Sequence, residues 1–144
     1  MKLREIIPVV AVLSSVGFGG GVPPDAAADD FKLSMRASPS SAFAPATITF
    51  IAQLRGGGDE ERCYCPTVEW DWGDGTTSQR TGDCEPYEPG KSKLERFFTG
   101  AHKYKQGGRY QVRLRLKRGG QLVVSGGTVV IIRPRVDEGE AQQD

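Results

Sequence analysis

Residues 70–75 read Trp-Asp-Trp-Gly-Asp-Gly, a short strand that runs into a tight turn. Alternate side chains of a strand share a face, so Trp70 and Trp72 point one way and Asp71 points the other. Asp-Gly is a strong hairpin signal, and the second glycine readily supplies the positive φ that tight hairpins require. We therefore expect the chain to reverse here and return as a short strand over 76–78. The expected turn residues are Gly73, Asp74 and Gly75.

Other segments show the same strand periodicity, with alternating apolar side chains and β-branched residues. These strands are expected over 31–35, 47–54, 68–72, 109–117, 121–124 and 128–132. The last two are expected to form one strand interrupted near Gly126-Gly127, where a bulge is predicted. Residues 80–93 are rich in turn formers and predict an extended insertion.

No segment shows sustained helical periodicity. About seven short strands separated by turn signals predict an all-β sandwich of two antiparallel sheets, with an open barrel as the alternative. Phe50, Trp70 and Tyr110 are the expected core aromatics, because large rings fill the space between packed sheets. Trp72 lies closer to the turn and is a candidate platform for stacking on a sugar.

The charge balance excludes some partners and suggests another. The chain has 144 residues, enough for one domain, with 19 Lys and Arg against 18 Asp and Glu. A formal net charge of +1 gives no sign of nucleic-acid binding. The outward positions of strand 109–117 carry Arg113, Arg115 and Lys117, and this basic row is a candidate binding site for an acidic polysaccharide or a cell-surface polyanion.

Both ends of the chain differ from the middle. Lys2 and Arg4 precede a short apolar stretch, and Ala26-Ala27-Ala28 offers small residues for cleavage, so residues 1–28 predict a secretory signal peptide. The apolar stretch is too short to span a membrane, which needs about 20 apolar residues. We expect the folded domain over 29–133 and a disordered acidic tail over 134–144.

Export would place the three cysteines in an oxidising compartment, where cysteine pairs form disulfides. Cys63 and Cys65 are two residues apart and would share a face of an extended strand, so either could pair with Cys84. We expect the Cys65 to Cys84 pairing. A zinc site made by the three cysteines and His102 is the alternative, although Cys-x-Cys is not a common zinc spacing.

The carboxylates near the turn do not predict catalysis. Asp71 and Asp74 would have to flank a substrate in a cleft to act as a glycosidase pair, and a tight turn provides none. A serine nucleophile needs a strained turn, and the sequence contains no Gly-x-Ser-x-Gly. We therefore expect no catalytic residues and no cofactor. Calcium is the possible ion near this turn, with oxygen ligands from Asp29, Asp30, Asp71 and Asp74.

Four motifs together resemble the polycystic kidney disease (PKD) repeat. Residues 70–78 resemble its Trp-Asp-Phe-Gly-Asp-Gly signature, with Trp72 in the place of phenylalanine. The stretch 37–50 resembles its first strands, His102-Lys103-Tyr104 its His-x-Tyr element, and 108–114 its penultimate strand. The resemblance covers about residues 31–133, and the chain departs from it at 55–65 and 80–98.

The resemblance implies an immunoglobulin-like β-sandwich used outside the cell as a spacer or contact module, with His102 as a scaffold residue. It implies no catalysis. We expect a secreted or periplasmic module that contacts a protein or a polysaccharide at the cell surface. The alternative is a structural spacer or accessory subunit of an envelope or secreted assembly.

Overall fold

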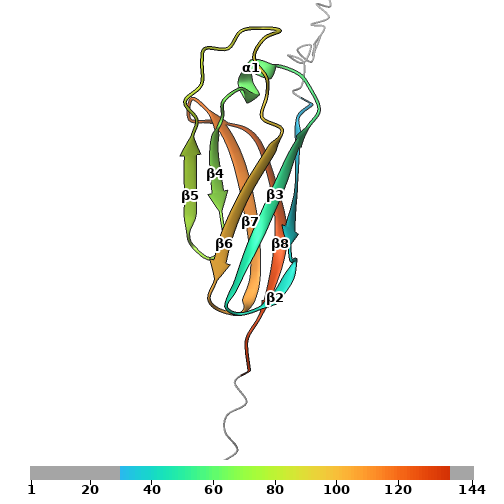
Figure 1. The fold of residues 1–144 in the computed structure, drawn as a ribbon, viewed down its shortest axis with the longest axis vertical. Helices are drawn as coiled ribbons and strands as arrows, with labels where there is room; N and C mark the ends of the chain where they lie inside the picture. The colour runs from blue at the N-terminus through green and yellow to red at the C-terminus, as the bar shows by residue number, and fades with distance from the viewer. Residues whose placement is uncertain (1–29, 137–144) are drawn as a thin grey trace, which may run out of the picture.

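Two packed β-sheets form the domain (Figure 1). The computed structural model describes residues 30–136, so the expected signal peptide 1–28 and residues 137–144 of the expected tail lie outside the described residues. The strands are β1 (Lys32–Ser38), β2 (Ser41–Phe43), β3 (Ala46–Arg55), β4 (Thr67–Asp71), β5 (Thr77–Thr81), β6 (Phe97–Tyr104), β7 (Gly108–Arg118) and β8 (Gln121–Arg133). The helix α1 (Glu60–Cys63) lies between β3 and β4, and no helix among residues 30–136 is long and apolar enough to cross a bilayer.

The strands divide into a three-stranded sheet in the order β1-β3-β6 and a five-stranded sheet in the order β2-β8-β7-β4-β5. The neighbours are antiparallel except β2 and β8, which are parallel. The parallel pair arises because the chain leaves the three-stranded sheet after β1 and crosses to the five-stranded sheet, where Ser41 lies beside Ile131. The sandwich prediction is confirmed, and the described residues form eight strands.

Two of these strands do not show the expected pattern in the sequence. β6 begins shortly after the turn-rich segment 80–93, and Gly100 interrupts its apolar alternation. β2 is three residues long and lies between Pro39 and Pro45, in a stretch whose serines and prolines indicate a turn and not a strand. Pairing with β3 and β8 holds these two strands in place, and such long-range pairing is not encoded in local periodicity.

The core lies where the inner faces of the two sheets meet. The inward-facing residues of β3 and β7 are Ile48, Phe50, Ala52, Leu54, Val112, Leu114 and Leu116, each at most 2% exposed. Burying one large apolar side chain contributes about 1.5–3 kcal/mol. A register slip by one residue would bring the polar face of either strand into the core, so the alternation fixes which faces meet.

Two stacked indoles occupy the centre of this core. The ring centroids of Trp70 and Trp72 are 5.0 Å apart with an interplanar angle of 2°, and Phe50 packs against both rings. Gly100 of β6 faces the pair, because a Cβ atom there would lie 2.9 Å from an atom of each indole. The indoles thus fill the space that a side chain at this position would need. Tyr110, also expected in the core, is only half-buried at its border.

The bulge of the five-stranded sheet is not where the sequence placed it. The β7–β8 register shifts between Leu116 and Lys117, which leaves Val123 as the extra residue. β8 continues through Gly126-Gly127 without interruption, so the predicted position was wrong. Gly126 is required for a different reason. β1 crosses β8 at this point, and a Cβ atom on Gly126 would lie 2.4 Å from the carbonyl oxygen of Leu33.

Candidate functional site

The turn between β4 and β5 holds its carboxylates in fixed directions. Gly73 and Gly75 adopt φ angles of 80° and 86°, values that favour glycine. Asp71 Oδ1 accepts a hydrogen bond from the backbone N–H of Gly73 at 3.0 Å. Asp74 Oδ1 accepts one from the backbone N–H of Thr76, also at 3.0 Å. One oxygen of each aspartate is therefore used to close the turn.

The second oxygen of Asp74 reaches across to β6. Its Oδ2 lies 2.7 Å from His102 Nε2, and the two side chains are 23% and 20% exposed. Burial raises the pKa of the Asp74 carboxyl, but hydrogen bonds from Thr76 and His102 outweigh burial and hold that pKa below its ordinary value. Asp74 is thus a charged, fully engaged carboxylate at neutral pH.

Trp72 is buried between two parallel rings. Trp70 covers one side, and His102 stacks on the other with centroids 4.8 Å apart and an interplanar angle of 4°. Tyr104 donates its phenolic hydrogen to the Trp72 carbonyl oxygen at 2.8 Å, and burial raises the Tyr104 pKa, so this donor stays neutral. Trp72 is 5% exposed, so the prediction of an exposed platform was wrong, because β6 covers the ring that the turn was expected to leave open.

A hollow of about 420 Å³, which we call the end pocket, opens beside the pair of His102 and Asp74. Lys103, Lys105 and Tyr110 also line it. The Tyr110 ring lies 4.4 Å, centroid to centroid, from that of the buried Tyr104, and its hydroxyl donates to the Gln106 carbonyl oxygen at 2.8 Å. The sequence analysis did not propose this pocket, because its walls come from the β4–β5 turn, the end of β6 and the start of β7.

The predicted basic row lies on the outer face of the five-stranded sheet, but most of its charge is balanced. Strand β4 places Glu69 opposite Arg115. Glu69 accepts hydrogen bonds from Arg115 at 3.0 Å and from Lys117 at 2.8 Å. These two hydrogen bonds, of which the one from Lys117 has the larger effect, hold the pKa of the Glu69 carboxyl below its ordinary value. The row faces outward as expected, but the neighbouring strand supplies a counter-charge that the sequence did not reveal. Its role as a polyanion site stays a prediction.

Arg113 is the exposed member of that row. In the register it stands between Asp71 of β4 and Gly127 of β8. Because Gly127 has no side chain, the surface is hollowed there, and Arg113, Gln111 and Ser125 line a groove of about 360 Å³. We call this outer surface the charged face; it includes Glu69 and Asp71 of β4 and Gln111, Arg113, Arg115 and Lys117 of β7.

The carboxylates considered for calcium are not gathered together. Asp71 and Asp74 are committed to the turn, and Asp30 pairs its backbone N–H with the Gly57 carbonyl at the other end of the sandwich. Asp29 lies outside the described residues. Within residues 30–136, no group of three or more His, Cys, Asp or Glu side chains is placed to hold a metal ion. The calcium site stays a prediction.

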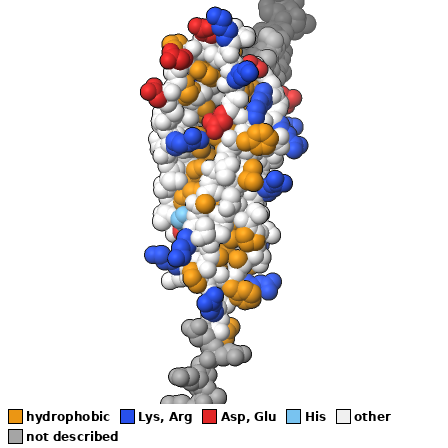
Figure 2. All heavy atoms as spheres, in the orientation of Figure 1, with side chains coloured by type: hydrophobic (Ala, Val, Ile, Leu, Met, Phe, Trp, Pro, Cys, Tyr) orange, Lys and Arg blue, Asp and Glu red, His pale blue; other side chains and the backbone are white. Residues whose placement is uncertain are grey.

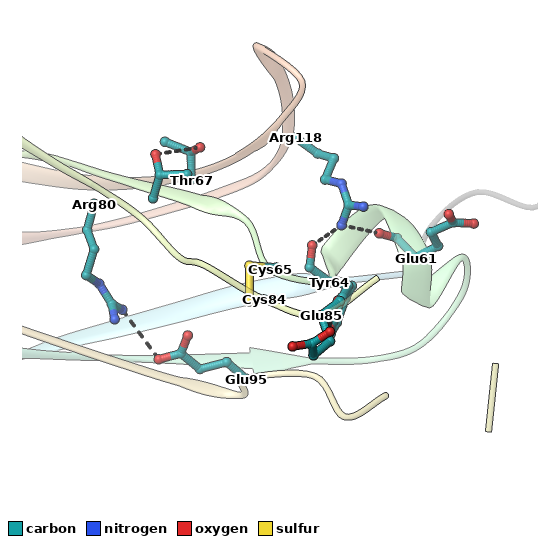
Figure 3. Close-up of a disulfide and its surroundings, with 10 residues drawn as sticks. Glu61, Tyr64, Cys65, Thr67, Arg80, Cys84, Glu85, Glu95 and Arg118 are labelled. Atoms are coloured by element: carbon teal, nitrogen blue, oxygen red, sulfur yellow. Dashed lines mark hydrogen bonds and ion pairs between the residues drawn. A yellow bond between two sulfur atoms is a disulfide. The ribbon is translucent and has the colours of Figure 1, made fainter. Parts of the chain in front are cut away.

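The disulfide joins Cys65 and Cys84, with Cα atoms 6.2 Å apart, and confirms the expected pairing (Figure 3). The geometry that leads to it differs from the expectation, because Cys63 is the buried last residue of α1 and Cys65 has a φ of 48°. The bridge uses two of the ligands of the alternative zinc site, and His102 is paired with Asp74 instead.

Side chains around the bridge fasten the long segment that follows β5 (Figure 3). Tyr64 donates its hydroxyl hydrogen to the Glu85 carbonyl oxygen at 2.7 Å. Arg118 donates to the carbonyl oxygens of Glu61 and Tyr64. The predicted insertion is thus tied through Glu85 and Cys84 to the residues that follow α1, and Arg118 ties these residues in turn to the end of β7.

Comparisons with known proteins agree with this architecture. The family model described as "PKD domain" matches residues 32–130. Among solved structures, the chain is similar to the PKD domain of an M14-like peptidase from a Thermoplasmatales archaeon, at 19% identity and a TM-score of 0.52, covering 71% of this chain and 93% of that one. It is also similar to a CARDB domain from Pyrococcus furiosus, at 12% identity and a TM-score of 0.47, covering 72% and 87%. No curated protein matches the sequence.

Proposed function

The chain belongs to the PKD domain family, and from that premise we propose that it is an exported, non-catalytic contact module that binds a protein partner through the charged face. PKD domains are generally non-catalytic modules. The observation that carries the proposal is the alternation of charge across β4 and β7, where Glu69 lies between two cationic side chains and Arg113 stands free of them.

A face of this kind suits a protein surface better than a polyanion. Three cationic side chains face two carboxylates, those of Glu69 and Asp71, so the face carries little excess charge to attract an acidic polymer. Alternating charges at fixed positions give specificity and register to a protein contact. Arg113 over a glycine-floored groove resembles the central arginine found at many interfaces.

The absence of catalysis is supported by the one histidine of the chain. His102 uses Nε2 to bind Asp74, and one face of its ring is covered by Trp72. The hydroxyl of Thr76, which lines the same pocket, donates to Asp74. A nucleophile activated by histidine requires a direct hydrogen bond between the two groups, and no such bond is present among residues 30–136.

Export is supported by two independent features. The N-terminal residues Lys2 and Arg4 followed by an apolar stretch fit a signal peptide. The Cys65 to Cys84 disulfide fits an oxidising compartment, because such bridges are rare in reducing ones.

A spacer role is the second candidate, and the course of the chain favours it. β1 begins at the end of the sandwich that carries α1, and β8 ends at the opposite end (Figure 1). A domain that receives the chain at one end and releases it at the other can separate two attached parts by its own length. This role would need no binding face.

Charge reversal on the two outer faces separates these functions. Arg113→Glu changes the charged face, whereas Arg36→Glu makes the same change at an exposed position of β1 in the other sheet. Each variant, and the wild type, is immobilised and exposed to the extracellular and envelope proteins of the producing cells. We expect a partner retained by the wild type and by Arg36→Glu to be lost from Arg113→Glu. Equal retention by all three proteins would contradict the proposal, and retention by none would leave the spacer role.

A further inference from the structure

We propose that the end pocket is a second binding site, separate from the charged face, for an anionic sugar residue that carries a carboxylate or a sulfate. The juxtaposition that carries this inference is a pair of lysines, Lys103 and Lys105, beside the fixed imidazole of His102 and the half-buried ring of Tyr110. The charged-face proposal does not depend on it.

The size of the hollow is suited to a small organic ligand. Its volume of about 420 Å³ falls within the roughly 300–1,000 Å³ that is typical of small-molecule sites. An inorganic anion would leave most of this space unfilled. One or two rings of a polysaccharide would occupy it better, while the rest of the polymer continued into solvent.

The charge around the pocket favours an anion. Lys103 and Lys105 are exposed, and neither forms an ion pair with any of residues 30–136. The one carboxylate of the lining, Asp74, keeps its negative charge while it accepts hydrogen bonds from Thr76 and His102, so the lining carries two lysines against one carboxylate. Figure 2 shows basic side chains at this lower end, near the histidine, whereas acidic side chains gather at the upper end.

The polar and aromatic parts of the pocket are preformed. His102 is held by Asp74 through Nε2 and by its stack on Trp72, so the ring cannot turn away. Its Nδ1 has no hydrogen-bond partner among the described residues and is left for a ligand hydroxyl. Tyr110 is held by its contact with Tyr104 and its hydrogen bond to a backbone carbonyl. Groups fixed before binding lose little entropy when the ligand arrives.

These features together define the ligand class. The lysines attract the anionic group, the imidazole nitrogen meets a hydroxyl, and the tyrosine offers an apolar surface to the ring of the sugar. An uncharged sugar would lack the first interaction, and inorganic sulfate would lack the other two.

The test is a titration of the full chain with four probes, followed by ¹⁵N NMR and calorimetry. The probes are trigalacturonate, a chondroitin sulfate tetrasaccharide, maltotriose and inorganic sulfate. We expect one or both anionic oligosaccharides to bind, to shift the amide signals of His102 and Tyr110, and to bind more weakly as salt is added. Maltotriose and inorganic sulfate should bind at least tenfold more weakly.

Variants locate the site. The double substitution Lys103→Gln and Lys105→Gln should raise the Kd about tenfold, the effect of losing roughly one charge-assisted hydrogen bond. Arg109→Gln, an exposed charge near this end but outside the pocket lining, should change it less than twofold. Both variants keep the core unchanged, and their melting temperatures check the fold.

Several results would overturn the inference. Binding of no probe would do so, as would equal binding of maltotriose, because charge would then have no role. Binding that survives the double lysine substitution but disappears in Arg113→Glu would move the anionic ligand to the charged face. One result would instead support the inference. If Arg113→Glu lost the partner protein but bound the oligosaccharide as the wild type does, the two sites would be separate, as expected.

Discussion

Replacing Gly100 with alanine tests the account of the core most directly. The backbone of this residue allows any side chain, because its φ is not in the positive range. Only space is limiting. The new Cβ atom would lie 2.9 Å from Trp70 Cε2 and 2.9 Å from Trp72 Cη2, closer than real Cβ contacts allow. Both neighbours are rigid rings inside a packed core, so neither can move aside without disturbing the other.

The expected cost follows from two opposing effects. Adding a methyl group to a full core costs about 1–3 kcal/mol. Replacing glycine with alanine also restricts the unfolded chain, which returns about 0.4–1 kcal/mol. The free energy of unfolding of Gly100→Ala should therefore fall by about 1–2 kcal/mol. For a domain of this size, such a change lowers the melting temperature by roughly 5–15 °C.

Urea unfolding followed by tryptophan fluorescence measures this change, and near-ultraviolet circular dichroism reports on the stacked indoles. Gly57→Ala is the matched control, because Gly57 is exposed, has no positive φ and has no atom within 4 Å of its added Cβ. We expect the control to change the free energy of unfolding by less than about 0.5 kcal/mol. If Gly100→Ala proved as stable as the control, with an unchanged dichroism spectrum, the packing argument would be refuted.

Three further outcomes are expected. Reducing the disulfide, which closes a loop with a sequence separation of 19, should lower the free energy of unfolding by about 3 kcal/mol. Alkylation of the unreduced, denatured chain should modify one cysteine, and modification of all three would contradict the bridge. Since the folded-state pKa of Asp74 lies below its ordinary value of 3.8, its ionised form stabilises the fold above that pH, and this stability is lost as pH falls further. Asp74→Asn should therefore lose less stability than the wild type when urea unfolding is compared at neutral and strongly acid pH, and parallel losses would argue against the contribution. Glu69→Gln should leave Lys117 without a counter-charge and Arg115 with Asp71 alone, at 3.8 Å. The variant should therefore elute from heparin at higher salt than the wild type, and identical elution would count against the charge balance of this face.

Much of the fold is a local property of the sequence. In β3 and β7 every second side chain is apolar, and a strand with one buried face requires that alternation, so both strands and their inner faces were predictable. The turn after β4 was predictable for a similar reason, because glycine is the residue that most easily adopts positive φ. The pairing of Cys65 with Cys84 was one of two choices that spacing alone left open.

The binding surfaces are not local. Whether Arg115 is available to a ligand depends on Glu69, which is 46 residues away and meets it only through the β4–β7 register. Whether Trp72 is exposed depends on β6, a strand that alternation did not reveal.

Local patterns of residues were enough to predict a β-sandwich, the strands that make its core and the position of its signature hairpin. The folded chain was needed to show that Trp72 is buried, that Arg113 stands apart from a neutralised row, and that Lys103 and His102 border one pocket with Tyr110. Burial along a strand follows from the strand's own residues, whereas charge balance and cavities depend on which strand lies beside it.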